Sequence, residues 1–283
     1  MKKRKKTLIV LLSILAVGVY LYWGNTAVQT SHFTYSNEKI PESFDDYKVV
    51  QVSDLHNTSF DGDLISKIRN EEPDIIVVTG DIIDRNRTDL GVAQDFLEQV
   101  IALAPVYFVS GNHEVASGKY PELQEILDEV GVTNLDNDNE VLTKGDEEIN
   151  LLGLADPLTI FYEEIDEEGS EELVIKRNLT EVSEDTSDTA LNLLLSHRAE
   201  LMEIYADSDV DLALTGHAHG GQIRLPIIGG LFSPSQGFFP KYTTGEYLEN
   251  NTTMIVSRGL GNSIFPLRVL NRPELVVITL DAG

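Results

Sequence analysis

Five apolar runs of this chain each end in a short polar motif built from Gly, Asp, Asn or His. The motifs are Asp54-Leu55-His56, Gly80-Asp81-Ile82-Ile83-Asp84-Arg85, Gly111-Asn112-His113-Glu114, Ser196-His197 and Gly216-His217-Ala218-His219-Gly220-Gly221. A short apolar run that stops at such a motif is typical of a strand buried on both faces. Loops at the carboxyl ends of strands in an open α/β sheet converge on one crevice. We therefore expect these five motifs to meet in space.

The spacing of apolar residues predicts an α/β fold. In the first half of the chain strands alternate with helices, which indicates a largely parallel sheet covered by helices. The expected strands are 47–53, 74–79 and 105–110, and the expected helices are 63–70, 89–103 and 119–130. Past residue 132 strands follow one another with fewer helices, at 141–143, 149–154, 191–195, 212–215, 222–226, 253–257 and 274–280. A second sheet packed on the first explains this change, so we predict a four-layer α/β/β/α sandwich of two mixed sheets.

The N-terminus carries a basic cluster, residues 2–6, followed by 17 uncharged residues at 7–23. As a helix this run covers roughly 25 Å, near the lower limit for spanning a bilayer. Its far end holds Tyr20, Tyr22 and Trp23, as an interfacial aromatic belt would. We predict a cytoplasmic basic tail at 1–6 and a single-pass transmembrane signal anchor at 7–24, which places the rest of the chain on the extracytoplasmic side of the cell membrane. A cleaved signal peptide is the alternative, although its apolar region is usually shorter and ends in small residues.

Residues 25–45 are interpreted as a linker, and an edge strand within them is left open. Residues 46–283 are interpreted as the globular domain. Within that domain the segment 163–188 holds eleven acidic and two basic residues. Such a composition favours a solvated insertion that is partly disordered.

Charge and cysteine content exclude several classes of function. The formal net charge is −26, and subtracting the five cations of residues 2–6 leaves −31 on the remainder. So acidic a body does not bind nucleic acid through a basic face. Any affinity for phosphate requires local positive charge, such as metal ions. The chain has no cysteine, so disulfides, thiolate catalysis and Cys-ligated zinc are excluded.

The motifs combine the imidazole and carboxylate groups that divalent cations bind. Asp-x-His and His-x-His place both side chains on one side of an extended loop, and Asp81 has two carboxylate oxygens with which to bridge two ions. Taken singly, each motif has a structural alternative, such as a turn with capping aspartates at 80–84 or a left-handed turn at Asn112. The five together favour metal binding. His32 lies outside the motifs and is predicted to be a surface histidine.

The ordered motifs resemble those of the calcineurin-like metallophosphoesterase superfamily. The segments "GHAHGGQI", "QGFFPKYTTGEY" and "SRGLGNSIFPLRVLNRPEL" are similar to its membrane-associated YkuE/YaeI-type branch, some members of which cleave the pyrophosphate of UDP-2,3-diacylglucosamine. The resemblance covers roughly residues 47–281 and implies that 46–283 is a metallophosphoesterase domain. Two departures stand out. Ser196-His197-Arg198-Ala199-Glu200 replaces the usual Ser-His-x-Pro-Asp/Glu, and position 84 is Asp, which argues against a ferric-tyrosinate centre.

The resemblance implies two divalent metal ions, with Mn favoured over Fe or Zn for this mixed N/O ligand set. The implied ligands are Asp54, His56 and His219 for the first ion, Asn112, His197 and His217 for the second, and Asp81 as the bridge. His113, with Asp84 and Arg85, is implied to be catalytic, and Glu114 to orient its neighbours by hydrogen bonds.

We therefore predict a membrane-anchored, metal-dependent hydrolase of a phosphodiester or pyrophosphate bond, with a lipid- or sugar-linked substrate as the favoured class. A water activated by the two ions would attack phosphorus in line. A phosphomonoesterase or nucleotidase, and a non-catalytic metal-binding scaffold on the same fold, remain alternatives, and the oligomeric state stays open. Residues 223–245 form either an apolar wall for such a substrate or a packed core loop. In the first case Leu231, Phe232, Phe238 and Phe239 would touch the bilayer.

Overall fold

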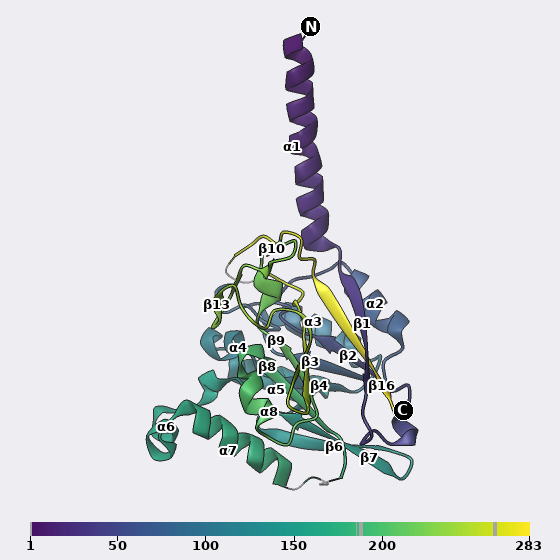
Figure 1. Ribbon diagram of the computed structural model, residues 1–283, viewed down its shortest axis with the longest axis vertical. Helices are drawn as coiled ribbons and strands as arrows, with labels where there is room; N and C mark the ends of the chain where they lie inside the picture. Colours follow the sequence, from purple (N-terminus) through teal and green to yellow (C-terminus); the bar gives the residue numbers. More distant parts are fainter. Residues whose placement is uncertain (1, 185, 187–188, 263–264) are drawn as a thin grey trace.

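The computed structural model describes residues 2–184, 186, 189–262 and 265–283. Two six-stranded mixed sheets pack face to face, and helices cover the outer face of each sheet (Figure 1). The expected four-layer α/β/β/α sandwich is therefore confirmed.

The first sheet carries the N-terminal half of the domain. Its order is β1 (Gln29–Ser36), β16 (Glu274–Asp281), β2 (Lys48–Val52), β3 (Ile75–Thr79), β4 (Val106–Val109) and β5 (Thr133–Asn134). Strands β2 to β5 run parallel, and β16 pairs antiparallel with β2. The outer face is covered by α2 (Asp63–Glu71), α3 (Leu90–Val100) and α5 (Tyr120–Val130). Residues 29–36, left open as linker or edge strand by the sequence, form the edge strand β1.

The second sheet has the order β14 (Gly245–Glu249), β15 (Thr252–Val256), β9 (Leu212–Gly216), β8 (Asn192–Arg198), β7 (Glu147–Gly153) and β6 (Asp138–Lys144). Helices α7 (Glu171–Glu184) and α8 (Met202–Ala206) cover its outer face. The inner faces of the two sheets bury one shared apolar layer that includes Val49, Val77, Leu151 and Leu193. Strands with apolar residues on both faces can fill such a layer and the helix layer at once.

The shorter elements lie between the strands. They are η1 (Glu42–Phe44), α4 (Asn112–Ser117), η2 (Pro157–Thr159), α6 (Tyr162–Glu168), η3 (Ala199–Leu201), η4 (His219–Gly221), β10 (Arg224–Leu225), β11 (Gly229–Gly230), β12 (Phe232–Ser233) and β13 (Gly237–Phe238). The strand expected at 222–226 is thus reduced to two residues that pair with β11.

The acidic segment 163–188 differs from its expectation. It contains all of α6 but its first residue and the whole of α7, and α7 buries Ile175, Leu179 and Val182 against the second sheet. The acidic residues of α7 are exposed while these apolar residues are buried, so the high charge hides an amphipathic pattern. The helical part is therefore not disordered; residues 185, 187 and 188 lie outside the described residues.

The N-terminal helix α1 (Lys2–Thr26) stands away from the body (Figure 1). Its stretch Lys3–Thr26 is long and apolar enough to cross a membrane, and almost all of it is exposed. At the foot of α1, Asn25 Nδ2 donates a hydrogen bond to the Arg268 carbonyl at 3.0 Å. Asn25 Oδ1 accepts one from the Arg268 backbone N–H at 2.7 Å. The Arg272 guanidinium lies 4.4 Å from the centre of the Trp23 ring. The helix α1 is thus tied to the loop that precedes β16.

Candidate metal centre

All five motifs lie at one edge of the sandwich. Three follow the carboxyl ends of β2, β3 and β4 in the first sheet, and two lie at the ends of β8 and β9 in the second. The sheets pack with these ends together, since β3 and β4 contact β8 across the interface. The five motifs therefore converge, as expected for loops at the carboxyl ends of strands.

One group of side chains gathers on the Asp54 side of the site. Ligand atoms of Asp54, His56, Asp81 and His219 all lie within 4.8 Å of one another, and all four residues are buried. The Nε2 atoms of His56 and His219 are 3.1 Å apart. His219 Nε2 lies 3.3 Å from Asp54 Oδ1, and His56 Nε2 lies 3.6 Å from Asp81 Oδ2.

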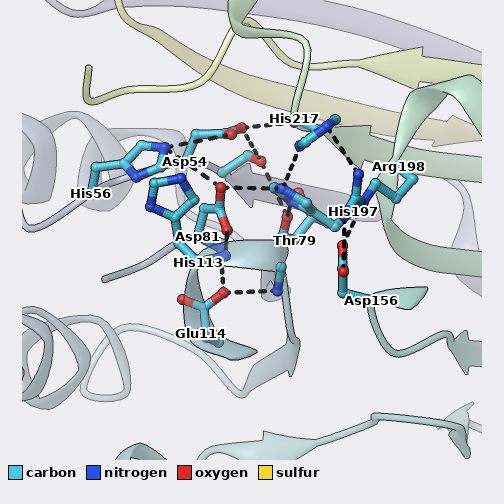
Figure 2. Close-up of polar contacts among 12 residues, drawn as sticks. Asp54, His56, Thr79, Asp81, His113, Glu114, Asp156, His197, Arg198 and His217 are labelled. Atoms are coloured by element: carbon cyan, nitrogen blue, oxygen red, sulfur yellow. Dashed lines mark hydrogen bonds and ion pairs between the residues drawn. The ribbon is translucent and has the colours of Figure 1, made fainter. Parts of the chain in front are cut away.

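A second group consists of Asp81, His197 and His217, also buried and also within 4.8 Å. His197 Nε2 lies 3.3 Å from Asp81 Oδ2 and 3.1 Å from His217 Nδ1. Figure 2 shows Asp81 between His56 on one side and His197 on the other. The oxygen Asp81 Oδ2 therefore faces both groups.

The donor atoms fit two divalent cations. Asp54 Oδ1 and Asn112 Oδ1 are buried without a hydrogen-bond partner, a costly state that a cation removes. Burial lowers the pKa of His56 to about 3 and holds the pKa values of His217 and His219 well below their usual range. These imidazoles are therefore neutral, as metal ligands must be.

Asp54 and Asp81 each have one carboxylate oxygen hydrogen-bonded within the protein and one that faces the site. Asp54 Oδ2 accepts hydrogen bonds from Ser53 Oγ at 2.7 Å and from the His217 backbone N–H at 3.2 Å. Asp81 Oδ1 accepts from the His113 backbone N–H at 2.7 Å. The imidazole of His197 donates through Nδ1 to the Thr79 carbonyl at 2.8 Å, so its Nε2 faces Asp81. The orientation of the donors is thus set before any ion binds.

Glu114 holds two of the loops together. Its Oε2 accepts hydrogen bonds from the backbone N–H groups of Asp81 and Gly111, both at 2.7 Å, and its Oε1 accepts from Ile83 at 3.2 Å. Burial raises the pKa of Glu114 to about 8, while the three donors act in the opposite direction. The side chain expected to orient its neighbours thus acts on the Asp81 loop.

The backbone is strained where the side chains converge. Asp54, His56, Asp81, His217 and His219 have φ between 47° and 65°, in the left-handed region. Each such residue costs roughly 1–3 kcal/mol unless its surroundings enforce it, and such strain clusters at functional sites. Gly80, at φ 82°, leaves no room for a side chain, because a Cβ would lie 2.6 Å from the Gly111 nitrogen.

The residues implied to be catalytic lie beside both groups. His113 Nδ1 accepts a hydrogen bond from the Arg85 backbone N–H at 3.1 Å, so the ring proton belongs to Nε2. Asp84 Oδ2 lies 3.8 Å from Nδ1 of both His113 and His56, and Asp84 Oδ1 caps its own turn by accepting from two backbone N–H groups. A pocket of about 240 Å³ opens here. It is lined by Asp81, Arg85, Asn112, His113, Leu158, Arg198, His217, His219, Pro234 and Ser235.

Sequence reasoning missed an ion pair at the rim of this pocket. The Arg198 guanidinium donates two hydrogen bonds to the Asp156 carboxylate, at 2.6 and 3.0 Å. Its Nη1 lies 2.9 Å from Ser235 Oγ and 3.2 Å from His217 Nε2. A signal for it existed, because Asp156 follows strand β7 just as the five motifs follow theirs. Arg198 itself gave no signal, because it occupies the unrestricted position of the Ser-His-x-Pro-Asp/Glu pattern.

A second missed residue lies behind the site. Arg268 is buried, and its Nη2 lies 3.3 Å from His219 Nδ1. The same guanidinium donates to the carbonyls of Arg258 and Gly261. His32 lies outside this arrangement, since its side chain is 59% exposed and its Nε2 lies 2.9 Å from Glu71 Oε2.

We expect metal affinity to rise by about tenfold per pH unit near neutrality. Burial works to lower the pKa of His197, but Asp81 and the neighbouring carboxylates raise it to about 10. Metal-free His197 is therefore protonated at neutral pH, and an ion must displace that proton, which is easier at higher pH. Titration calorimetry with Mn²⁺ in buffers of different ionisation enthalpy should detect this proton release. An affinity that is flat between about pH 6 and 8, with no proton released, would contradict the assignment.

Residues 47–221, which contain all five motifs, match the sequence model of a family described as calcineurin-like phosphoesterase. The metallophosphoesterase YkuE of Bacillus subtilis (strain 168) is 31% identical over 263 residues, covering 90% of this chain and 86% of that protein. The phosphodiesterase YaeI of Escherichia coli (strain K12) is 26% identical over 242 residues, with coverages of 83% and 82%. A transmembrane protein with metallophosphoesterase domain from Danio rerio is 27% identical over 255 residues, with coverages of 86% and 55%.

Proposed function

Because this chain belongs to the calcineurin-like phosphoesterase family, we propose that it is a membrane-anchored, two-metal enzyme that cleaves a phosphodiester or pyrophosphate bond in a lipid- or sugar-linked substrate. The family resemblance seen in the motifs, including the YkuE/YaeI-type branch, is confirmed. The chain is accordingly a metal-dependent phosphoester hydrolase.

The observation that carries the proposal is the shared carboxylate. Asp81 Oδ2 lies 3.6 Å from His56 Nε2 and 3.3 Å from His197 Nε2, so one oxygen belongs to both groups of donors. In this proposal Asp54, His56 and His219 would hold one ion, Asn112, His197 and His217 would hold the other, and Asp81 would be shared by both. The mixed nitrogen and oxygen set favours Mn over Mg or Ca.

When bound, two such ions supply a nucleophilic water at neutral pH and offset the charge that develops on the phosphoryl oxygens. The chain's own residues would position the substrate and supply a proton to the departing oxygen. His113 Nε2 carries a proton at the pocket, where it can be donated to the departing oxygen. Arg85 and Arg198 line the same pocket and are placed to bind further phosphate oxygens. Asp156 holds the Arg198 guanidinium in a fixed orientation.

An apolar pocket next to the metal pocket supports an amphiphilic substrate. It has a volume of about 580 Å³ and exposes almost no polar surface. Its lining consists of Gly221, Gln222, Ile223, Leu231, Phe232, Pro234, Phe238 and Phe265. Pro234 lines both pockets, so an apolar group here would be continuous with a phosphate at the metals. A pocket of this kind suits an acyl or isoprenoid chain.

Two further observations support membrane anchoring. The helix α1 is exposed and apolar over Lys3–Thr26, and the basic cluster at its start predicts that the enzymatic domain lies outside the cytoplasm. The similar Danio rerio protein is itself described as a transmembrane protein.

Removing the anchor should separate the two kinds of substrate. We expect deletion of residues 2–19, which retains the foot of α1 on the body, to lower turnover of a lipid-linked pyrophosphate in vesicles by on the order of 10²-fold, because anchoring raises the effective concentration. Hydrolysis of soluble bis-p-nitrophenyl phosphate should be unchanged. Initial rates on both substrates with added Mn²⁺ make the measurement. Equal losses on the two substrates would count against an amphiphilic substrate, and no turnover of either would count against the enzyme.

A further inference from the structure

Exposed apolar side chains gather on two loops at the end of the body where α1 leaves it. They are Ile227, Ile228, Phe238, Phe239, Phe265 and Leu270, here called the apolar rim. Ile227 is fully exposed, and Phe238 and Phe239 are 78% and 68% exposed. Figure 1 shows β10 beside the foot of α1, and β13, which belongs to the same loop, on the side of the body below it. Exposed apolar patches of this kind mark interaction surfaces.

Backbone contacts join the two loops to each other and to the anchor. The Arg224 N–H donates to the Val269 carbonyl at 3.0 Å, which links the loop at 223–239 to the loop at 265–270. The Leu270 N–H donates to the Tyr20 hydroxyl at 3.3 Å. Tyr20 and Trp23 form the aromatic belt of α1, and such residues settle at the level of the lipid headgroups. Leu270 is therefore held at that level.

Charge separates this end of the molecule from the rest. The chain has 47 acidic residues, yet none occurs between Asp211 and Glu246 or between Glu249 and Glu274. These two stretches contain both rim loops and carry five basic residues, of which Arg268 is buried and Arg258 is paired with Glu274, which leaves Arg224, Lys241 and Arg272 at least partly exposed. A bilayer surface disfavours carboxylates, and anionic lipids attract basic side chains. The absence of carboxylates from both rim stretches, together with the link from Leu270 to Tyr20 of the apolar helix α1, favours a lipid surface over a protein partner.

We propose that the apolar rim is a second membrane contact, which inserts into the headgroup region of the bilayer beside α1. The proposal rests on the membrane anchoring proposed above and adds an orientation to it. Phe238 and Phe265 belong both to the rim and to the lining of the apolar pocket, so insertion opens that pocket to the lipid phase. A lipid-linked substrate then reaches the metals without leaving the membrane.

The absence of native cysteine allows single labelled sites in the full chain. We would attach an environment-sensitive fluorophore to Phe239→Cys and to Ile227→Cys, neither of which lines a described pocket, and reconstitute each into nanodiscs of phosphatidylethanolamine and phosphatidylglycerol. The matched control is Phe161→Cys, which is 71% exposed and precedes α6, at the end of the body away from α1 (Figure 1). Unchanged hydrolysis of bis-p-nitrophenyl phosphate reports that each variant is folded.

We expect the labels at 239 and 227 to lose most of their fluorescence to a nitroxide carried on the lipid and little to aqueous iodide, with the reverse at 161. Quenching of all three labels by iodide, while the chain stays in the nanodisc, would overturn the rim contact and leave the anchor intact. Shielding from both quenchers would overturn it in favour of a protein partner or a second copy. A chain that fails to enter nanodiscs would overturn the anchoring and the rim contact together, while activity on the soluble ester would still stand.

Discussion

Replacing Asp81 with Asn removes metal from both halves of the site and lowers turnover by about 10³-fold or more. The loss is large because metal charge stabilisation is worth several kcal/mol, and 1.36 kcal/mol is a factor of ten in rate. The substitution keeps the size of the side chain but replaces one oxygen with an NH₂ group, which cannot bind a cation. Metal content per chain and hydrolysis of bis-p-nitrophenyl phosphate, measured on the same preparation, make the test.

The matched control is Asp146→Asn, an exposed carboxylate in the turn between β6 and β7. It should retain full metal content and full activity. An Asp81→Asn variant that binds two ions per chain would show that the carboxylate does not bridge, whatever its effect on rate.

Replacing His113 with Asn should leave the metal content nearly unchanged and lower turnover by roughly 10²–10⁴-fold, the usual contribution of a positioned general acid. The reason is that His113 lines the pocket but belongs to neither group that shares Asp81. The loss should be greater for a phenyl phosphodiester than for its p-nitrophenyl counterpart, because a poorer leaving group depends more on the donated proton. Steady-state rates on both esters, with metal analysis, make the measurement.

His32→Asn is the control, since that histidine is exposed and distant in sequence from every motif. Full activity in the His113 variant would remove this residue from the mechanism. Equal losses on the two esters would assign it to charge stabilisation and not to proton donation.

The sequence predicted the layers of this fold because two periodicities carry that information. A short run rich in Ile and Val that ends at a glycine, such as 74–79, favours a strand buried on both faces, and the change of pattern after residue 132 indicated the second sheet. The position of the site followed from the same runs, since loops at the carboxyl ends of strands share one edge. Asp54, Asp81 and His197 could therefore be placed together from sequence.

Other features of the structure were not predicted from the sequence. Asp81 and His219 have left-handed backbone conformations, which the surrounding structure must enforce. The residue types alone did not predict these conformations. The assignment of one tied and one free oxygen to each carboxylate depends on donors such as the His113 N–H, which tertiary structure supplies. In α7 the signal existed, but the charge of the segment was given more weight than the spacing of Val174 and Leu179.

The most direct test of the account is diffraction from crystals grown with Mn²⁺, with data collected at the manganese absorption edge. We predict two anomalous peaks per chain, about 3.5–4 Å apart, with an oxygen of Asp81 in contact with both. A single peak, or two peaks that do not share Asp81, would contradict the two-metal centre.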